Sequence, residues 1–280
     1  FGKSGFFVYN NIFLFSSALV IFIGTIFPLI YETLYSRQIT VGRTYYDVLV
    51  GPLLLILLGL MIFSVKLSIK NLNIQKWLND NVVLINIALM VTIFTLFLLN
   101  NSYILIVTVS FSFLLIFTTV SNFYKNFRVP KGSSSYWTGQ IAHLGIGIFA
   151  LGIILNVSQS FSTEKELNSF QEFNFNNETY FVYDTIEERL PEKNVLKLPI
   201  SNSKQTKYTS LNIFKNSSQQ AISSPAVFRS IINDIYITVK FINEDSYKLI
   251  VRNNYGVLIM WIGLLITSLS FIPRLRKNEV

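Results

Sequence analysis

The sequence predicts an α-helical membrane protein with about six transmembrane helices and a small β-rich extramembrane domain inserted before the last helix. Hydrophobic residues make up 51% of the 280 residues, charged residues only 14%, and the mean hydropathy is +0.47. Apolar runs of about 20 residues, enough to span a bilayer, recur along the chain. A polar stretch of roughly 95 residues separates the last two runs and is too long for a simple loop. The expected organisation is a five-helix region at 1–158, the β-rich domain at 159–253, and a final helix with a basic tail at 254–280.

The predicted spans are residues 12–32, 49–69, 81–99, 102–122, 137–158 and 255–273. A tight turn at residues 99–102 predicts that the third and fourth spans form a helical hairpin. Pro28 is expected to break the first helix near its outer end, with Thr25 satisfying the backbone at the kink. Residues 40–46 predict a re-entrant segment, or an interfacial one anchored by its tyrosines.

The charges are distributed asymmetrically about these spans. On one side of the membrane, only the acidic residues Asp80 and Glu279 offset ten basic residues. The insert on the other side holds eleven basic and eleven acidic residues, so its net charge is zero. The positive-inside rule makes the basic side cytoplasmic or matrix, and it places the insert in the periplasm or intermembrane space. Topology and lipid headgroup contact explain this charge better than nucleic-acid binding. The basic residues are Lys3, Lys66, Lys70, Lys76, Lys125, Arg128, Lys131, Arg274, Arg276 and Lys277.

The insert has the residue pattern of strands. Residues 177–186, 207–214, 234–243 and 246–252 combine apolar alternation with β-branched and aromatic side chains. Pro191, Pro199 and Pro225, with neighbouring Ser and Asn, are expected to mark the turns. The insert is therefore predicted to be a small β-rich domain.

His143 is the single histidine of the chain and lies within the fifth predicted span. A histidine in a membrane helix faces the bundle interior or a cofactor, so both a hydrogen-bonded core histidine and a metal ligand are possible interpretations. Gly139, Gly145, Gly147 and Gly152 share this helix, and such residues either allow close helix packing or leave room for a flat macrocycle. With one histidine, a haem here would receive only one axial ligand from this chain.

Other chemistries lack the residues they require. The absence of cysteine excludes thiolate metal sites, disulfides and cysteine catalysis. The sequence has no Gly-rich phosphate loop, no carboxylates paired in a pattern typical of a catalytic cleft, and no Ser/His/Asp set. Carboxylates are nearly absent from the spans, which argues against an ion-coupled transporter.

Several motifs occur in the order found in one family. The chain resembles the C-terminal half of the CcmF family of cytochrome c haem lyase subunits, with the related NrfE proteins. The motifs are Asn11–Phe15 with Gly24–Leu29, Ile39–Tyr46, Gly51–Leu53, Ile141–Gly145, Ser224-Pro225 through Asp234–Val239, and Trp261–Gly263 with Arg274 and Arg276. Together they extend over almost the whole chain.

The resemblance implies a subunit of the system I lyase, which attaches haem to apocytochrome c through thioether bonds. It implies that His143 is one axial ligand of a membrane-embedded haem b, with the second ligand from another chain. The implied partners are a haem chaperone, apocytochrome c and membrane lipid, and no nucleic acid. The alternative is a structural subunit of a large inner-membrane respiratory assembly without haem chemistry.

The departures from the family pattern point to a split protein. The chain has neither the family's tryptophan-rich haem-receiving segment nor its other histidines, and Arg43–Tyr46 replaces the family's "PPYF". The resemblance therefore implies an organelle-encoded fragment, inactive as an enzyme by itself. Its N-terminal CcmF half would be a separate chain. The expected location is the mitochondrial inner membrane, or the bacterial inner membrane if the protein is not organellar.

Overall fold

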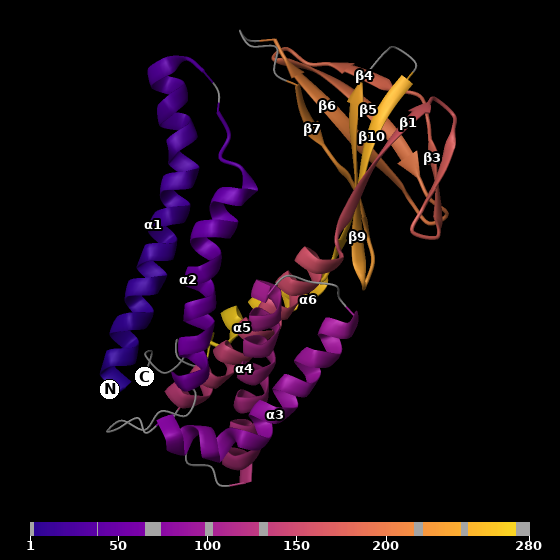
Figure 1. Cartoon of the computed structure of the whole chain (residues 1–280). Coiled ribbons are helices and arrows are strands. Elements are labelled where there is room, and N and C mark those ends of the chain that lie inside the picture. The colour runs from indigo at the N-terminus through magenta and orange to yellow at the C-terminus, as the bar shows by residue number, and fades with distance from the viewer. Residues whose placement is uncertain are drawn as a thin grey trace. The chain divides into compact units, whose positions relative to one another are not determined.

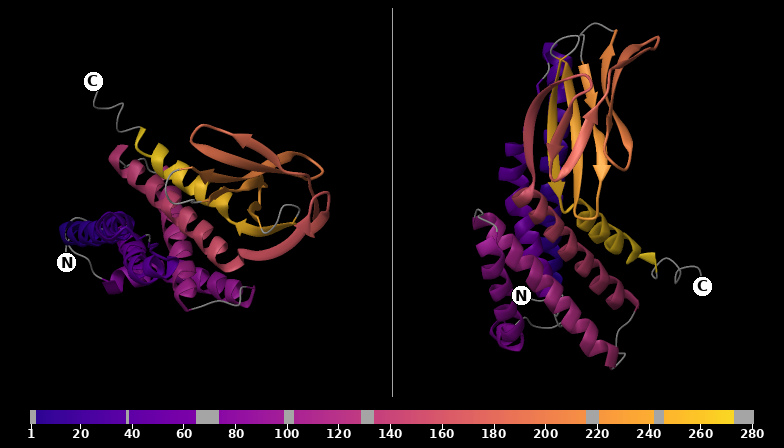
Figure 2. Two further views of the ribbon diagram at one scale, coloured as in Figure 1. Left: turned by 90° about the horizontal axis from the view of Figure 1, so that it is seen from above. Right: turned by 90° about the vertical axis from the view of Figure 1, so that its right-hand side faces the viewer.

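The computed structural model of the chain describes residues 3–37, 39–64, 74–98, 103–128, 134–215, 221–241 and 246–272 (Figures 1 and 2). The chain divides into two compact units, one of Phe1–Ile154 with Ile259–Val280 and one of Leu155–Leu258. The predicted turn at 99–102 lies outside the described residues, as do six of the predicted basic-side residues: Lys66, Lys70, Lys131, Arg274, Arg276 and Lys277.

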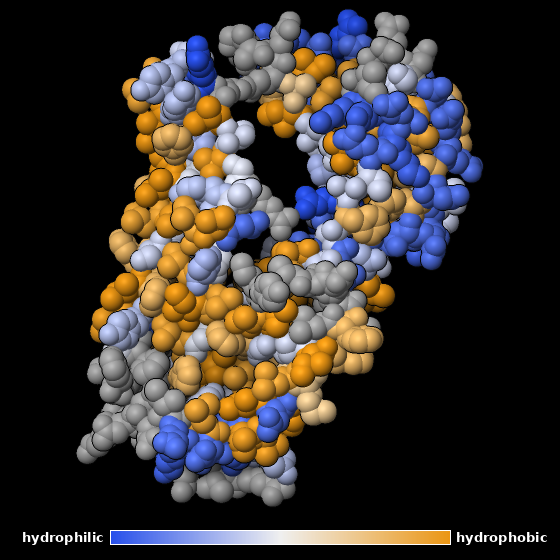
Figure 3. Space-filling model, in the orientation of Figure 1, coloured by the Kyte–Doolittle hydropathy of each residue, from blue (hydrophilic) through white to orange (hydrophobic). Residues whose placement is uncertain are grey.

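Long apolar helices form the first unit. Five of the described helices are long and apolar enough to cross a membrane: α1 (Lys3–Tyr35), α2 (Arg43–Ser64), α3 (Ile74–Leu98), α4 (Tyr103–Arg128) and α5 (Ser134–Gln159). The sixth, α6 (Val257–Leu269), has 13 residues. Apolar side chains cover the visible surface of these helices (Figure 3), and Phe97 is 95% exposed. An apolar surface of this extent faces lipid rather than water, so the predicted multi-pass membrane fold is confirmed.

The segment around Pro28 differs from the prediction. α1 continues through Pro28 to Tyr35 instead of breaking. Proline lacks the N–H that would bond the carbonyl four residues earlier, which is that of Gly24. The Thr25 hydroxyl does not reach this carbonyl, because it donates to Ile21 O at 2.7 Å.

The expected re-entrant segment is instead a short link followed by the first turn of α2. Tyr45 and Tyr46 lie in this turn, and Tyr45 Oη donates to Val20 O of α1 at 3.1 Å. A Cβ atom on Gly24 would lie 2.6 Å from the Tyr45 ring and 3.0 Å from Tyr46 Oη. Gly24 therefore makes the flat surface on α1 against which both tyrosines pack.

The second unit is built from two antiparallel sheets. The first sheet has the order β1-β10-β9-β8, and the second has the order β2-β3-β5-β6-β7 with β4 also paired to β5. The strands are β1 (Phe161–Asn168), β2 (Glu172–Phe175), β3 (Glu178–Val182), β4 (Ile186–Arg189), β5 (Lys193–Ser201), β6 (Thr206–Phe214), β7 (Ala221–Ser224), β8 (Ala226–Arg229), β9 (Asn233–Phe241) and β10 (Ser246–Tyr255). Pro225 lies where the chain leaves the second sheet and enters the first.

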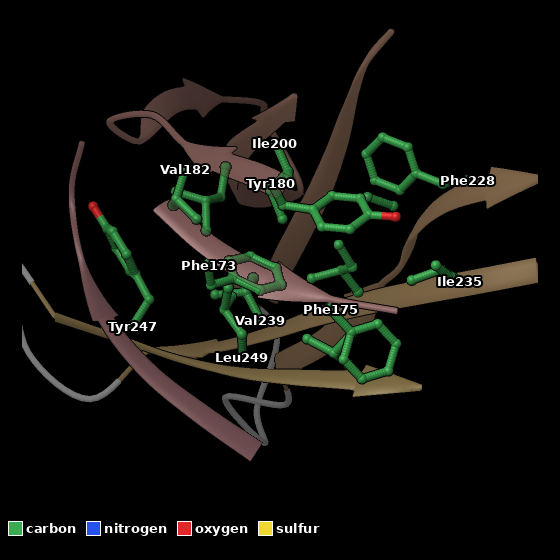
Figure 4. Packing of buried hydrophobic residues seen from close by; sticks show 14 residues of the cluster. Phe173, Phe175, Tyr180, Val182, Ile200, Phe228, Ile235, Val239, Tyr247 and Leu249 are labelled. Carbon is green, nitrogen blue, oxygen red and sulfur yellow. The ribbon is translucent and has the colours of Figure 1, made fainter. Parts of the chain in front are cut away.

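The inner faces of the two sheets enclose one apolar core (Figure 4). The rings of Phe173 and Tyr180 stack with centroids 5.3 Å apart. Tyr180 Oη donates to Glu178 at 2.7 Å, and burial, followed by this contact, raises the pKa of the phenol. Val182, Ile237 and Leu249 are fully buried beside these rings.

The prediction that Pro199 marks a turn is wrong. Pro199 lies inside β5, where it pairs with Tyr208. Leu198, Pro199 and Ile200 are all buried, so this part of β5 lacks the alternation that identifies a half-buried strand. The predicted strand at 177–186 is also shorter. It ends at Val182, and the Asp184 carboxylate accepts the Thr185 N–H at 2.8 Å before β4 begins.

A pair of isoleucines tests the core of the β-rich unit. Replacing fully buried Ile237 by alanine (I237A) should lower the free energy of unfolding by about 2–5 kcal/mol, because it removes packed methyl groups and leaves a cavity. The matched I222A change removes a side chain that is 53% exposed on β7 and should have little effect. Pulse proteolysis of the full-length protein in micelles measures both values, and equal losses would contradict this core.

A pair of glycines tests the contact between α5 and α6. A Cβ on Gly145 would contact Thr267 Oγ1 and lie 2.7 Å from Gly263 O and Thr267 N, whereas one on Gly51 would meet nothing within 4 Å. Backbone atoms cannot move aside as a side chain can, so G145A should destabilise the helices by about 1–3 kcal/mol. G51A should leave stability unchanged or raise it by up to about 1 kcal/mol. Unfolding by detergent titration compares them, and a neutral G145A would refute the close contact.

Candidate functional site

His143 lies in α5, a helix that packs against an apolar core built with α2, α3 and α4 in the first unit. The buried apolar side chains of this core are Leu58, Ile62, Trp77 and Leu115, and Ile146 on α5 packs against them. The Trp77 and Phe63 rings lie 4.8 Å apart. His143 itself is only partly buried.

The contact that positions the imidazole comes from the last residue of α2. Ser64 Oγ lies 3.1 Å from His143 Nε2 and also donates to Met61 O at 2.8 Å. A hydroxyl has one hydrogen, so when Ser64 donates it to Met61, His143 Nε2 must be the N–H that donates to Ser64. The neutral imidazole then carries its lone pair on Nδ1.

His143 Nδ1 is buried and has no hydrogen-bond partner among the described residues. Leaving such an atom unsatisfied costs about 1–3 kcal/mol. A ring nitrogen with an uncommitted lone pair is also the donor that a haem iron or another metal requires. The chemistry of the residue therefore suits an axial ligand.

Gly139 leaves open space on the same face of α5. It precedes His143 by four residues, and residues with this spacing lie above one another on a helix. A Cβ atom on Gly139 would meet nothing within 4 Å among the described residues. A flat group beside the imidazole would therefore meet no side chain at this position.

Gly145 and Gly147 have a different role. A Cβ on Gly147 would lie 2.8 Å from Ile116 of α4, and Gly145 is closed by Gly263 and Thr267 of α6. Of the two interpretations of these glycines, close helix packing is therefore correct, and neither one clears room for a macrocycle. The described residues contain no group of three or more His, Cys, Asp or Glu side chains that could hold a metal ion.

Sequence reasoning missed Ser64. It is a single serine at the end of an apolar run, and such residues commonly bond only their own helix. No local signal shows that it faces His143, which is 79 residues away. The contact depends on how α2 and α5 pack, which sequence spacing does not specify.

Comparison with known proteins gives a consistent result, although no family model matches the chain. The chain is 28% identical over 167 residues to the cytochrome c-type biogenesis protein CcmF of Pseudomonas fluorescens. It is 26% identical over 168 residues to the CcmF of Pseudomonas aeruginosa. Each match covers 56% of this chain and 25% of the relative. The chain therefore matches about a quarter of the length of these relatives.

A solved structure shares the fold. The "Cytochrome c Heme Lyase CcmF" superposes with a TM-score of 0.72 and 14% identity, covering 98% of this chain and 46% of that one. The superposition includes the helices and the β-rich unit that precedes the last helix. The sequence relatives and this shared fold confirm the resemblance of the chain to a C-terminal part of the CcmF proteins.

Proposed function

We propose that this chain is a subunit of a cytochrome c haem lyase and contributes one axial ligand, His143, to a membrane-embedded haem b. The observation that carries the proposal is the buried Nδ1 of His143, which has no hydrogen-bond partner among the described residues, in a fold shared with the haem lyase CcmF. The lyase would attach haem to apocytochrome c through thioether bonds. Alone, the chain would be inactive.

The residues around His143 would have different roles in binding such a haem. Ser64 would fix the ring orientation through Nε2 and so keep the lone pair on Nδ1. Gly139 would leave the adjacent face of α5 open. The apolar side chains of α2, α3 and α4 would exclude water from the imidazole. When bound, the haem would supply one-electron chemistry that keeps the incoming haem iron reduced.

The remaining parts of the site would come from other molecules. A single histidine supplies one axial position, so the second ligand would belong to the N-terminal CcmF half, carried on a separate chain. A haem chaperone and apocytochrome c would be the other partners, near the β-rich unit. The assembly would lie in the mitochondrial inner membrane, or in the bacterial inner membrane where the relatives that the comparison found occur.

Replacing the ligand tests the proposal directly. In the complex of the two halves, H143A should abolish the low-spin b-type haem spectrum, because iron loses an axial nitrogen. Added imidazole should restore the spectrum, since a free ligand can occupy the vacated position but cannot repair a packing defect.

Two outcomes would contradict the ligand assignment. The first is an intact low-spin haem in H143A, and the second is a loss that imidazole does not rescue. Co-purification with respiratory complexes instead of with cytochrome c maturation proteins would support the structural-subunit alternative.

Ser64 provides a separate prediction about positioning. S64A should lower haem affinity about 10- to 100-fold, which is typical for the loss of a partner that orients a ligating histidine. The matched change is S110A on α4, because Ser110 Oγ bonds Ile106 O of its own helix at 2.9 Å and has no other bond among the described residues. Haem titration of both variants measures the effect, and equal affinities would show that Ser64 does not orient the imidazole.

A further inference from the structure

The turn between β8 and β9 exposes two large aliphatic side chains. Ile231 is 81% exposed and Ile232 is 69% exposed, the highest values among the large apolar side chains described in the β-rich unit. Arg229, just before the turn, is also exposed. Exposed isoleucines at a tip are unfavourable in water, so their place in the fold requires an explanation.

Several polar groups of this turn form hydrogen bonds within the β-rich unit, although the buried Asn253 Nδ2 has no partner among the described residues. Ser230 N donates to Asn233 O at 3.0 Å, and Asn233 Nδ2 donates to Asn253 Oδ1 at 2.6 Å. Gly256 N donates to Ile232 O at 3.4 Å. Apolar surroundings penalise unpaired polar groups, and these bonds remove much of that penalty. The tip therefore presents chiefly two apolar side chains to whatever surrounds it.

Strand register places the tip at the end of the unit where the helices attach. Asn233 pairs with Tyr255, the last residue of β10, so Ile231 and Ile232 lie beyond β10 and alongside Gly256. The chain enters α6 at Val257.

The C-terminal end of α5 also lies beside the last residue of β10. Asn156 Nδ2 in the last turns of α5 donates to Tyr255 O at 3.1 Å, and Ser160 Oγ accepts the Tyr255 N–H at 3.1 Å. α5 is apolar enough to span a membrane up to Gln159. The tip is therefore level with the residues at which α5 ends and α6 begins.

We propose that the β8–β9 tip inserts Ile231 and Ile232 into the lipid interface of the leaflet on that side and so anchors the β-rich unit to the bilayer. Aliphatic side chains at this depth leave water for the boundary between headgroups and acyl chains. The exposed Arg229 guanidinium beside them suits the lipid phosphates. Membrane lipid is favoured over a protein partner because the register holds the tip at the helix ends.

The absence of cysteine from the chain makes a direct test possible. Single-cysteine variants I231C and I232C, labelled with the fluorophore NBD, would be placed in the full-length protein in nanodiscs of phosphatidylcholine and phosphatidylglycerol. The matched control is I222C, which replaces an isoleucine 53% exposed on β7. The labels at 231 and 232 should emit at shorter wavelength than the control and lose intensity with doxyl-labelled lipids, whereas the label at 222 should do neither.

Two results would overturn the proposal. Emission at 231 and 232 that matches the control would place the tip in water. A shift to shorter wavelength without quenching by doxyl lipids would show that protein, either a partner or a second copy, covers the tip instead of lipid.

Discussion

The close approach of α5 and α6 is the constraint on which much of the structure depends. Each glycine in the pair Gly145 and Gly263 lies so near the other helix that a methyl group would strike backbone atoms. No hydrophobic force drives two helices together in lipid, so van der Waals contact of this kind has to hold them. Because α5 and α6 are the helices on either side of the β insert, their contact brings the two ends of the insert together. The Tyr255 bonds to Asn156 and Ser160 continue the same pairing within the β-rich unit.

The two ring nitrogens of His143 differ in their hydrogen bonding. Ser64 satisfies one ring nitrogen and the other remains unpaired among the described residues. A purely structural histidine would be replaceable by an apolar residue that avoids this cost. Under the proposed function, haem binding at Nδ1 would offset the free-energy cost of leaving this nitrogen unpaired. Ser64 is important for the same reason. By bonding Nε2, it determines that Nδ1 is the ring nitrogen without a hydrogen-bond partner among the described residues.

The sequence predicted the helices well because a span needs only length and apolar composition. His143 was identifiable for a similar reason, being the single histidine and lying in a span. Predictions failed where a residue's role depends on a distant neighbour. Pro199 belongs to a strand because β5 is buried on both sides, and Gly145 serves packing because α6 crosses it. Ser64 meets His143 only through the packing of α2 on α5. For each of these residues the local sequence allows several roles. Tertiary contacts, which local patterns do not encode, determine which role the residue has.

The β-rich unit and the helices are linked by one recurring feature, which is that polar groups at the helix ends are paired before they reach lipid. Asn156, Ser160 and Gly256 all bond within residues 155–258, at the point where the chain passes between unit and membrane. Such pairing is required wherever backbone approaches hydrocarbon, because no water is available to replace it. A strand hairpin that ends at this level meets the same requirement, and its turn satisfies it with Ser230 and Asn233. In the proposed anchoring, Ile231 and Ile232 would be the apolar side chains that this turn presents to lipid, beside the exposed Arg229.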